Sequence, residues 1–265
     1  MLLNESPFIC PVCRTKMFVL PSNLRCLKGH SFDVAKQGYV NLLMNNSSSK
    51  RHGDDKLMVS SRTSFLEKGY YSPLRDALKE ILGSGQKVLD AGCGEGYYTS
   101  AFSKNNCVCG IDISKDALKS ASKRCKNVSF AVASISDIPL ADGTQDVIVS
   151  IFAPDNNNEF KRILRPNGRL ITVVPMERHL FELKSAIYDK PYLNPEVNSE
   201  RDGFLLKSAK ELKYSIIFEC NEDIIALFKM TPYYYKTGKS DQEKLIKLKS
   251  LTTKVEFCLL EYIKI

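Results

Sequence analysis

The strongest constraint on the fold is a glycine-rich turn between an apolar strand and a helix. The run from Val88 to Gly96, Val-Leu-Asp-Ala-Gly-Cys-Gly-Glu-Gly, ends a strand and opens a helical stretch at Tyr97. Glycines at such a turn let the backbone approach a ligand closely, and the first amide groups of the helix point toward it. The turn therefore predicts a strand-turn-helix unit whose ligand lies against the backbone.

The same alternation continues along the chain. Apolar strands are expected at 87–90, 108–111, 128–132, 147–152 and 169–174, with helices between them at 115–125 and 156–164. Continuous apolar strands that alternate with helices are typical of a parallel sheet covered on both faces. Strand-like segments near 204–219 and 254–264, with short helices near 222–229 and 241–250, predict antiparallel strands added to that sheet. The expected fold class is α/β, a doubly wound, Rossmann-like sheet.

Composition divides the chain into three regions. Residues 1–45 carry closely spaced cysteines, and residues 45–53 form a polar stretch typical of a linker. Apolar residues at helical spacing then predict two helices between residues 54 and 82, joined near Gly69-Tyr70-Tyr71. We therefore expect a small N-terminal domain at 1–45, a linker with connecting helices at 46–83, and the α/β domain at 84–265.

A cysteine and histidine cluster defines the first region. Cys10, Cys13, Cys26 and His30 follow the pattern C-x2-C-x12-C-x3-H, two ligand pairs on short turns. Four such ligands predict a closed, tetrahedral zinc site with a structural role. Metal binding contributes about 10–16 kcal/mol in small zinc modules, which a short region with little core requires to fold. A redox CxxC pair is the alternative, but it needs no second pair of ligands.

The charge of the chain suggests an anionic partner. Lysine and arginine outnumber aspartate and glutamate by 38 to 30, and residues 1–51 hold seven cations against two acids. Such a concentration in one small module favours nucleic acid over a merely solvated surface. No apolar run reaches the roughly 18–20 residues of a membrane helix, and the N-terminus lacks the layout of a signal peptide. We therefore expect a cytoplasmic protein.

Two ligand classes compete for the glycine turn. A dinucleotide fingerprint needs G-x-G-x-x-G, but here the third glycine comes one position early. Asp90 and Glu95 would also face a pyrophosphate, and two like charges about 4 Å apart cost about 4 kcal/mol at an effective dielectric of 20. The ammonium and sulfonium of S-adenosylmethionine would instead be attracted. Asp112, at the end of the next strand, is then expected to accept the ribose hydroxyls, and Asp137 the adenine amino group.

These motifs resemble two known families. The run Val88 to Gly96 is similar to motif I of class I S-adenosylmethionine-dependent methyltransferases. A narrower likeness, to the type A family of large-subunit ribosomal RNA guanine-N1 methyltransferases, covers nearly the whole chain. It rests on Cys10-Pro-Val-Cys13, Gly38-Tyr-Val-Asn-Leu-Leu43, Phe65-Leu66 with Gly69-Tyr-Tyr71, Gly92-Cys-Gly-Glu-Gly-Tyr-Tyr98, Ala153-Pro154, Pro175-Met-Glu-Arg-His179-Leu-Phe-Glu-Leu183 and Met230-Thr-Pro-Tyr233.

The resemblance implies methylation of a guanine N1 in a hairpin of 23S ribosomal RNA, with the zinc module holding RNA. It also implies cofactor contacts from Tyr71, Gly96 with Tyr97, and His179, beside Gly92 and Gly94 of the turn. After Ala153-Pro154 the chain departs from the family pattern, since Asp155-Asn156-Asn157-Asn158 replaces a turn that contains cysteine. Asp155 follows the fourth strand and is our candidate acceptor of the N1 proton. His179 is the alternative.

Two other functions are compatible with these motifs. The first is a nucleic-acid-binding regulator whose zinc finger reads a site and whose methyltransferase-like domain senses the cofactor. The second is a methyltransferase of another RNA or of a small molecule, for which the cationic zinc module would have no purpose. The oligomeric state is open, with a homodimer as one alternative.

Overall fold

The computed structural model describes residues 4–44 and 53–265, and most strands belong to one eight-stranded sheet. Its order is β11-β12-β10-β9-β6-β7-β8-β5, and the six strands from β10 to β5 run parallel. The strands of this sheet are β5 (Tyr39–Asn41), β6 (Lys87–Ala91), β7 (Cys107–Asp112), β8 (Ser129–Val132), β9 (Gln145–Ile151), β10 (Leu164–Pro175), β11 (Phe204–Phe218) and β12 (Leu251–Lys264). The helices are α1 (Lys56–Glu67), α2 (Ser72–Leu82), α3 (Tyr97–Phe102), α4 (Lys115–Arg124), α5 (Asn157–Ile163), α6 (Phe181–Ile187), α7 (Asn221–Lys229) and α8 (Lys239–Ile246).

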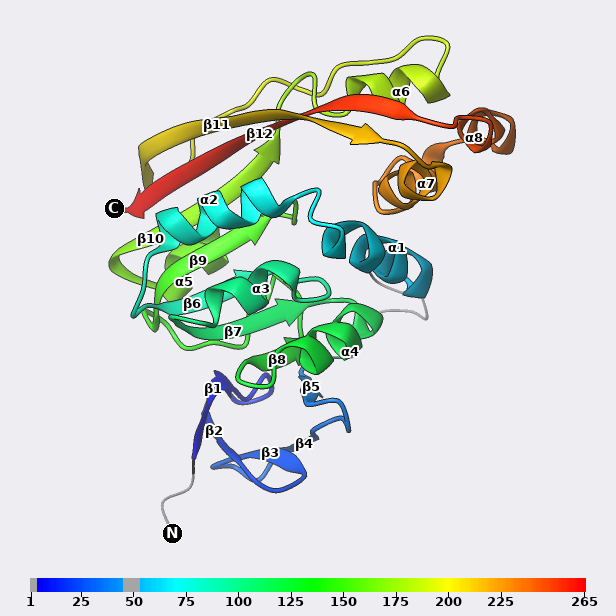
Figure 1. The fold of residues 1–265 in the computed structure, drawn as a ribbon. Coiled ribbons are helices and arrows are strands. Elements are labelled where there is room, and N and C mark those ends of the chain that lie inside the picture. The colour runs from blue at the N-terminus through cyan, green and yellow to red at the C-terminus, as the bar shows by residue number, and fades with distance from the viewer. Residues whose placement is uncertain (1–3, 45–52) are drawn as a thin grey trace.

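Helices cover both faces of the sheet, as a doubly wound fold requires (Figure 1). Neighbouring residues of β6 point to opposite cores, because Val88 packs with the α2 and α4 side and Leu89 packs with α5. Both side chains are fully buried. The expected α/β class is confirmed, and each strand and helix proposed from the sequence between residues 54 and 174 is present within a few residues of its expected bounds.

The C-terminal strands extend the sheet in the antiparallel sense. β12 pairs with β10 along Arg169 to Pro175, and β11 pairs with β12 along nearly its whole length. This confirms the expected antiparallel addition, with β11 at the edge. The helix α6, between β10 and β11, was not expected from the sequence. Within the described residues, no helix is long and apolar enough to cross a membrane.

The N-terminal region packs against the large sheet. Strands β1 (Glu5–Ile9), β2 (Lys16–Val19), β3 (Asn23–Cys26) and β4 (Ser31–Asp33) form a separate four-stranded antiparallel sheet. Three apolar residues of this small sheet belong to the same buried cluster as the α5 face of the large sheet. These residues are Phe8, Met17 and Leu24. β5 lies inside the stretch expected to be the N-terminal domain, yet it pairs with β8 of the large sheet. The expected linker lies almost wholly at 45–52, outside the described residues.

Candidate functional site

The four predicted metal ligands converge on one point in the N-terminal module. The ligand atoms of Cys10, Cys13, Cys26 and His30 all lie within 4.8 Å of one another. Cys13 Sγ is 3.6 Å from Cys26 Sγ, and His30 Nδ1 is 3.4 Å from Cys26 Sγ and 3.5 Å from Cys10 Sγ. The edges of a tetrahedron around Zn²⁺ with these ligands measure about 3.5–3.8 Å. The four side chains therefore fit a tetrahedral zinc ion, with no position left for a substrate.

The glycine turn lies at the carboxyl edge of the parallel strands, where α/β sheets bind ligands. Gly92, Gly94 and Gly96 all have positive φ, between 56° and 83°. A Cβ on Gly92 would lie 2.5 Å from the Cβ of Ala153, so this position accepts no side chain. The amide of Gly94 donates to Asp112 Oδ2 at 2.9 Å, which joins the turn to the end of β7.

Three acidic side chains gather around this turn. Asp90 is buried, and burial raises its pKa to about 7, although Thr99 Oγ1 donates to Asp90 Oδ2 at 2.6 Å. Burial also raises the pKa of Glu95 and of Asp112. Glu95 Oε1 is buried and, among the described residues, has no hydrogen-bond partner. Such acids are costly to bury unless a cationic ligand completes the site, which agrees with the ammonium and sulfonium of S-adenosylmethionine.

Tyr71 and His179, two of the residues predicted to contact the cofactor, lie against Phe257 of β12, as does Phe152. The ring centroid of Phe257 lies 5.1 Å from that of Tyr71, 4.6 Å from that of His179 and 5.2 Å from that of Phe152. These residues come from the α1–α2 junction, the β10–α6 loop and the end of β9. Phe257 escaped the sequence analysis, because an apolar residue in a strand near the C-terminus gives no functional signal. Tyr97, at the start of α3, packs its ring against that of Tyr98, with centroids 5.1 Å apart, and its hydroxyl accepts from Arg75.

His179 is a neutral hydrogen-bonding group in this structure. Burial lowers its pKa to about 3, and its Nδ1 accepts the backbone N–H of Glu256 at 3.2 Å. The proton of the neutral ring therefore lies on Nε2, which can donate to a ligand. Asn194 holds the loop that carries His179, since its side-chain amide donates to the carbonyl of Met176 and its backbone amide donates to that of Glu177.

The two remaining predicted residues have partners that the sequence did not suggest. Asp137 forms an ion pair with Arg14 of the N-terminal module at 3.0 Å. Ile135 reaches to within 3.9 Å of the position of a Cβ on Gly92, whereas Ile138, next to Asp137, is fully buried. Asp155 is half exposed at the carboxyl edge, and Arg201 Nη2 donates to its Oδ2 at 2.7 Å.

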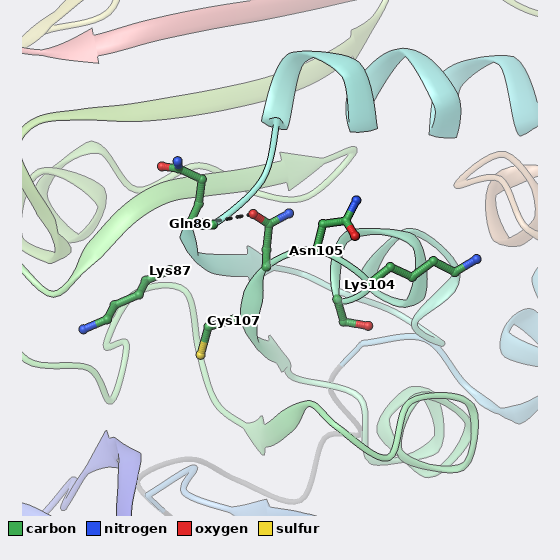
Figure 2. Close-up of a pocket in the computed structure, with 8 residues that line it drawn as sticks. Gln86, Lys87, Lys104, Asn105 and Cys107 are labelled. Atoms are coloured by element: carbon green, nitrogen blue, oxygen red, sulfur yellow. Dashed lines mark hydrogen bonds between the residues drawn. The ribbon is translucent and has the colours of Figure 1, made fainter.

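A surface hollow lies at the opposite edge of the sheet. It is formed by 85–87 and 103–107, at the amino ends of β6 and β7 (Figure 2). The side chains that line it include Lys87, Lys104 and Cys107. The backbone N–H of Gln86 donates there to Asn106 Oδ1 at 2.9 Å. None of the predicted site residues lies in this hollow.

Comparison with known families agrees with the two-part architecture. Residues 82–231 match a family model described as a methyltransferase domain, and residues 8–50 match a zinc-ribbon model described as RlmA, N-terminal. The YcgJ protein of Bacillus subtilis shares 16% identity, with 72% of this chain and 97% of that chain covered and a TM-score of 0.50. That likeness shows the fold alone. The chain is a class I methyltransferase with S-adenosylmethionine as cofactor and a structural zinc ion.

Two relatives in sequence narrow the family. YxjB of Bacillus subtilis (strain 168), named provisionally as a 23S rRNA (guanine-N(1)-)-methyltransferase, is 34% identical over 277 residues, 97% of both chains. The 23S rRNA (guanine(748)-N(1))-methyltransferase of Streptomyces fradiae is 38% identical over 188 residues, which are 67% of this chain and 66% of its own. The acidic glycine turn, the three-cysteine and histidine cluster and these relatives together show that the chain belongs to the family of 23S rRNA guanine-N1 methyltransferases.

Proposed function

We propose that this protein transfers the methyl group of S-adenosylmethionine to N1 of a guanine in a hairpin of 23S ribosomal RNA. The observation that carries the proposal is the acidic glycine turn joined in one chain to a cationic zinc ribbon, in a chain that YxjB matches over 97% of both lengths. An enzyme of ribosomal RNA would act in the cytoplasm. Whether it works as a homodimer is a separate question, which sedimentation of the purified protein would answer.

The bound cofactor would supply an electrophilic methyl group on its sulfonium. Asp112 of β7, the turn from Gly92 to Gly96, Tyr71 and His179 are the residues proposed to hold it. The protein must then place guanine N1 in line with that methyl and keep water away. N1 of a paired guanine is hidden in the helix, so the target base has to come from a loop or be flipped out.

Phe152 is a suitable surface for the extruded base. It directly follows β9 at the carboxyl edge, its side chain is 47% exposed, and its φ is +53°. Few non-glycine residues adopt this conformation, and such strain concentrates at functional sites. The ring is backed by Phe257 and so has a fixed position for stacking. Alternative platforms are Tyr70, Tyr98 and Tyr233, but they pack against the core.

Asp155 stays our candidate for accepting the N1 proton. Arg201 engages its Oδ2 and also donates to Asn157 Oδ1 at 2.8 Å, so one arginine braces the turn after Pro154. Within residues 4–44 and 53–265, Arg201 contacts only Oδ2, and Oδ1 of Asp155 can accept a proton or a hydrogen bond from the base edge. His179 is less suited to this role, because its Nδ1 is occupied and its pKa is low.

Replacing Asp155 tests this assignment. Asp155→Asn should lower the single-turnover rate of methylation about 100-fold, within the range of general-base catalysis, because the amide cannot take up the proton. Affinity for S-adenosylhomocysteine should change less than about threefold, since Asp155 is no part of the proposed cofactor site. Asn158→Ala, in the first turn of the neighbouring helix α5, is the matched control. A rate that is unchanged in Asp155→Asn contradicts the role.

The substrate itself is tested with labelled cofactor and RNA. We expect label in 23S rRNA and in a hairpin transcript cut from it, and mass mapping should place the methyl on guanine N1. If the protein binds RNA and cofactor but transfers no label to total ribosomal RNA, the regulator hypothesis is favoured and the proposal fails. Label in another RNA, or only in small molecules, would also contradict it.

A further inference from the structure

Arg62 of α1 extends over the glycine turn from a segment distant in sequence. Its Nη1 is 3.6 Å from the position that a Cβ on Gly94 would occupy. The same guanidinium forms an ion pair with Asp54, and both side chains are only 26% exposed. Arg62 therefore occupies a site at the mouth of the turn rather than open solvent.

The segment before α1 is fitted closely to the end of β7. Gly53 has φ +75°, and a Cβ there would lie 2.7 Å from Ile113 Cγ2. Ser114 Oγ donates to the carbonyl of Asp54 at 2.5 Å. Because Ile113 and Ser114 directly follow Asp112, this packing fixes the Asp54–Arg62 pair next to the proposed ribose site.

The electrostatic surroundings of Arg62 are those of the cofactor site. Burial opposes its charge, but the carboxylates of Asp54, Glu95 and Asp112 outweigh this effect and raise its pKa. Two other arginines lie near the turn, and each already has an acidic partner. Arg124 pairs with Glu67 and donates from Nε to the backbone carbonyl of Glu95 at 3.2 Å, Arg75 pairs with Asp76, and both lie against the ring of Tyr97.

One group of the cofactor is negatively charged and would need a cationic partner in this acidic site. Asp90, Glu95 and Asp112 suit its ammonium and sulfonium, but its methionine part also bears a carboxylate. That carboxylate would be repelled by the three acids unless a positive group lies beside it. A guanidinium is well suited, since its planar fork binds both oxygens of a carboxylate.

We propose that Arg62 recognises the carboxylate of the methionine part of S-adenosylmethionine, exchanging its contact with Asp54 for the cofactor. Arg62 is thereby a specificity residue that distinguishes amino-acid cofactors from analogues that lack this group. The proposal rests on the cofactor and not on the identity of the RNA, so the two can fail separately.

Calorimetric binding of two ligands to the full chain tests the proposal. The ligands are S-adenosylmethionine and decarboxylated S-adenosylmethionine, which keeps the ammonium and the sulfonium. Arg62→Gln should weaken the first about 10- to 100-fold, the cost of a lost charge-assisted hydrogen bond, and leave the second within about threefold or tighter. Arg62→Lys should retain part of the preference for S-adenosylmethionine. Arg165→Gln, which removes an equal charge beside Asp146 outside the site, should change neither affinity.

Asp54→Asn provides an independent test that keeps Arg62 in place. If the carboxylate replaces Asp54 as the partner of Arg62, removing this competing charge should tighten S-adenosylmethionine but not the decarboxylated analogue. Equal weakening of both ligands by Arg62→Gln, with an unchanged melting temperature, would show that Arg62 only supports Asp112 and Glu95, and would overturn the proposal. Unchanged affinity for both ligands would do the same.

Discussion

At the scale of single residues, the site depends on acids that are buried before any ligand binds. Asp90 has a pKa of about 7 in the folded chain because it is buried, against an ordinary value of 3.8. Between these values the folded state keeps a proton that the unfolded state has lost. The contribution of Asp90 to stability is therefore full below about pH 4 and is lost as the pH rises through 7.

This raised pKa predicts a pH-dependent affinity. The positive groups of the cofactor favour the ionised carboxylate, so S-adenosylmethionine should bind more tightly as the pH rises from 6 to 8. Asp90→Asn, which can still accept from Thr99, should bind more weakly at pH 8 and show a flatter profile. Calorimetry across this range measures both effects. His179 should not contribute, because its pKa of about 3 keeps it neutral throughout.

Gly92 is the most restrictive glycine of the turn. Its positive φ and the 2.5 Å approach to Ala153 predict that Gly92→Ala displaces the end of β9 and weakens cofactor binding at least tenfold. Gly94→Ala has the same backbone strain, about 1 kcal/mol, but meets only the flexible end of Arg62. Thermal unfolding and binding of S-adenosylhomocysteine compare the two variants. A larger loss in Gly94→Ala would contradict this ranking.

At the scale of elements, the zinc module is joined to the catalytic sheet by packing as well as by sequence. The amide of Ile9 donates to the carbonyl of Pro139 at 2.9 Å, and Arg14 pairs with Asp137 in the same loop. The exposed ion pair alone is worth little, about 0–1 kcal/mol. The shared apolar cluster is the stronger link, because unfolding the module would expose Phe8, Met17 and their partners on the large sheet.

Zinc removal should therefore destabilise the whole chain. We expect Cys26→Ser, or stripping the metal with a chelator, to lower the melting temperature of one cooperative transition by several degrees or more. Scanning calorimetry with and without zinc is the measurement, and Cys220→Ser, which removes a thiol outside the metal cluster, is the control. Two separate transitions, with the second unaffected by zinc, would show that the zinc module unfolds independently of the large sheet.

At the scale of the whole molecule, two kinds of basic residue in the zinc module can be distinguished. Arg14 and Lys16 pair with Asp137 and Glu5, whereas Arg25 and Lys28 are exposed and form no ion pair with the described residues. Binding to phosphates releases counterions, so the affinity for RNA should fall steeply with salt.

Arg25 and Lys28 should account for more of the salt dependence of RNA binding than Arg14 and Lys16. Arg25→Ala with Lys28→Ala should flatten the logarithmic salt slope by about two and raise the KM for RNA, with little change in single-turnover rate at saturating RNA. Arg14→Ala with Lys16→Ala is the matched control and should flatten the slope less. Filter binding at several salt concentrations measures the slopes. A parental slope in the Arg25 and Lys28 variant would mean that the module does not hold the RNA.

Local signals in the sequence predict the separate units of this protein. The C-x2-C-x12-C-x3-H spacing predicted four side chains that the structure brings together, and the glycine turn predicted the proposed cofactor site beside Asp90 and Asp112, because both signals lie in short stretches whose geometry is set by turns and strand ends. The α/β alternation followed from strand and helix periodicity for the same local reason.

How these units meet depends on contacts between residues that lie far apart in the sequence. Phe257, Arg62 and Arg201 reach the site from elements far along the chain, and no local pattern distinguishes them from core or surface residues. The pairing of Asp137 with Arg14 and of β5 with β8 likewise joins segments about a hundred residues apart. Contacts of this kind are selected by the packing of the complete sheet, since burial and charge compensation are satisfied only when all the elements are assembled.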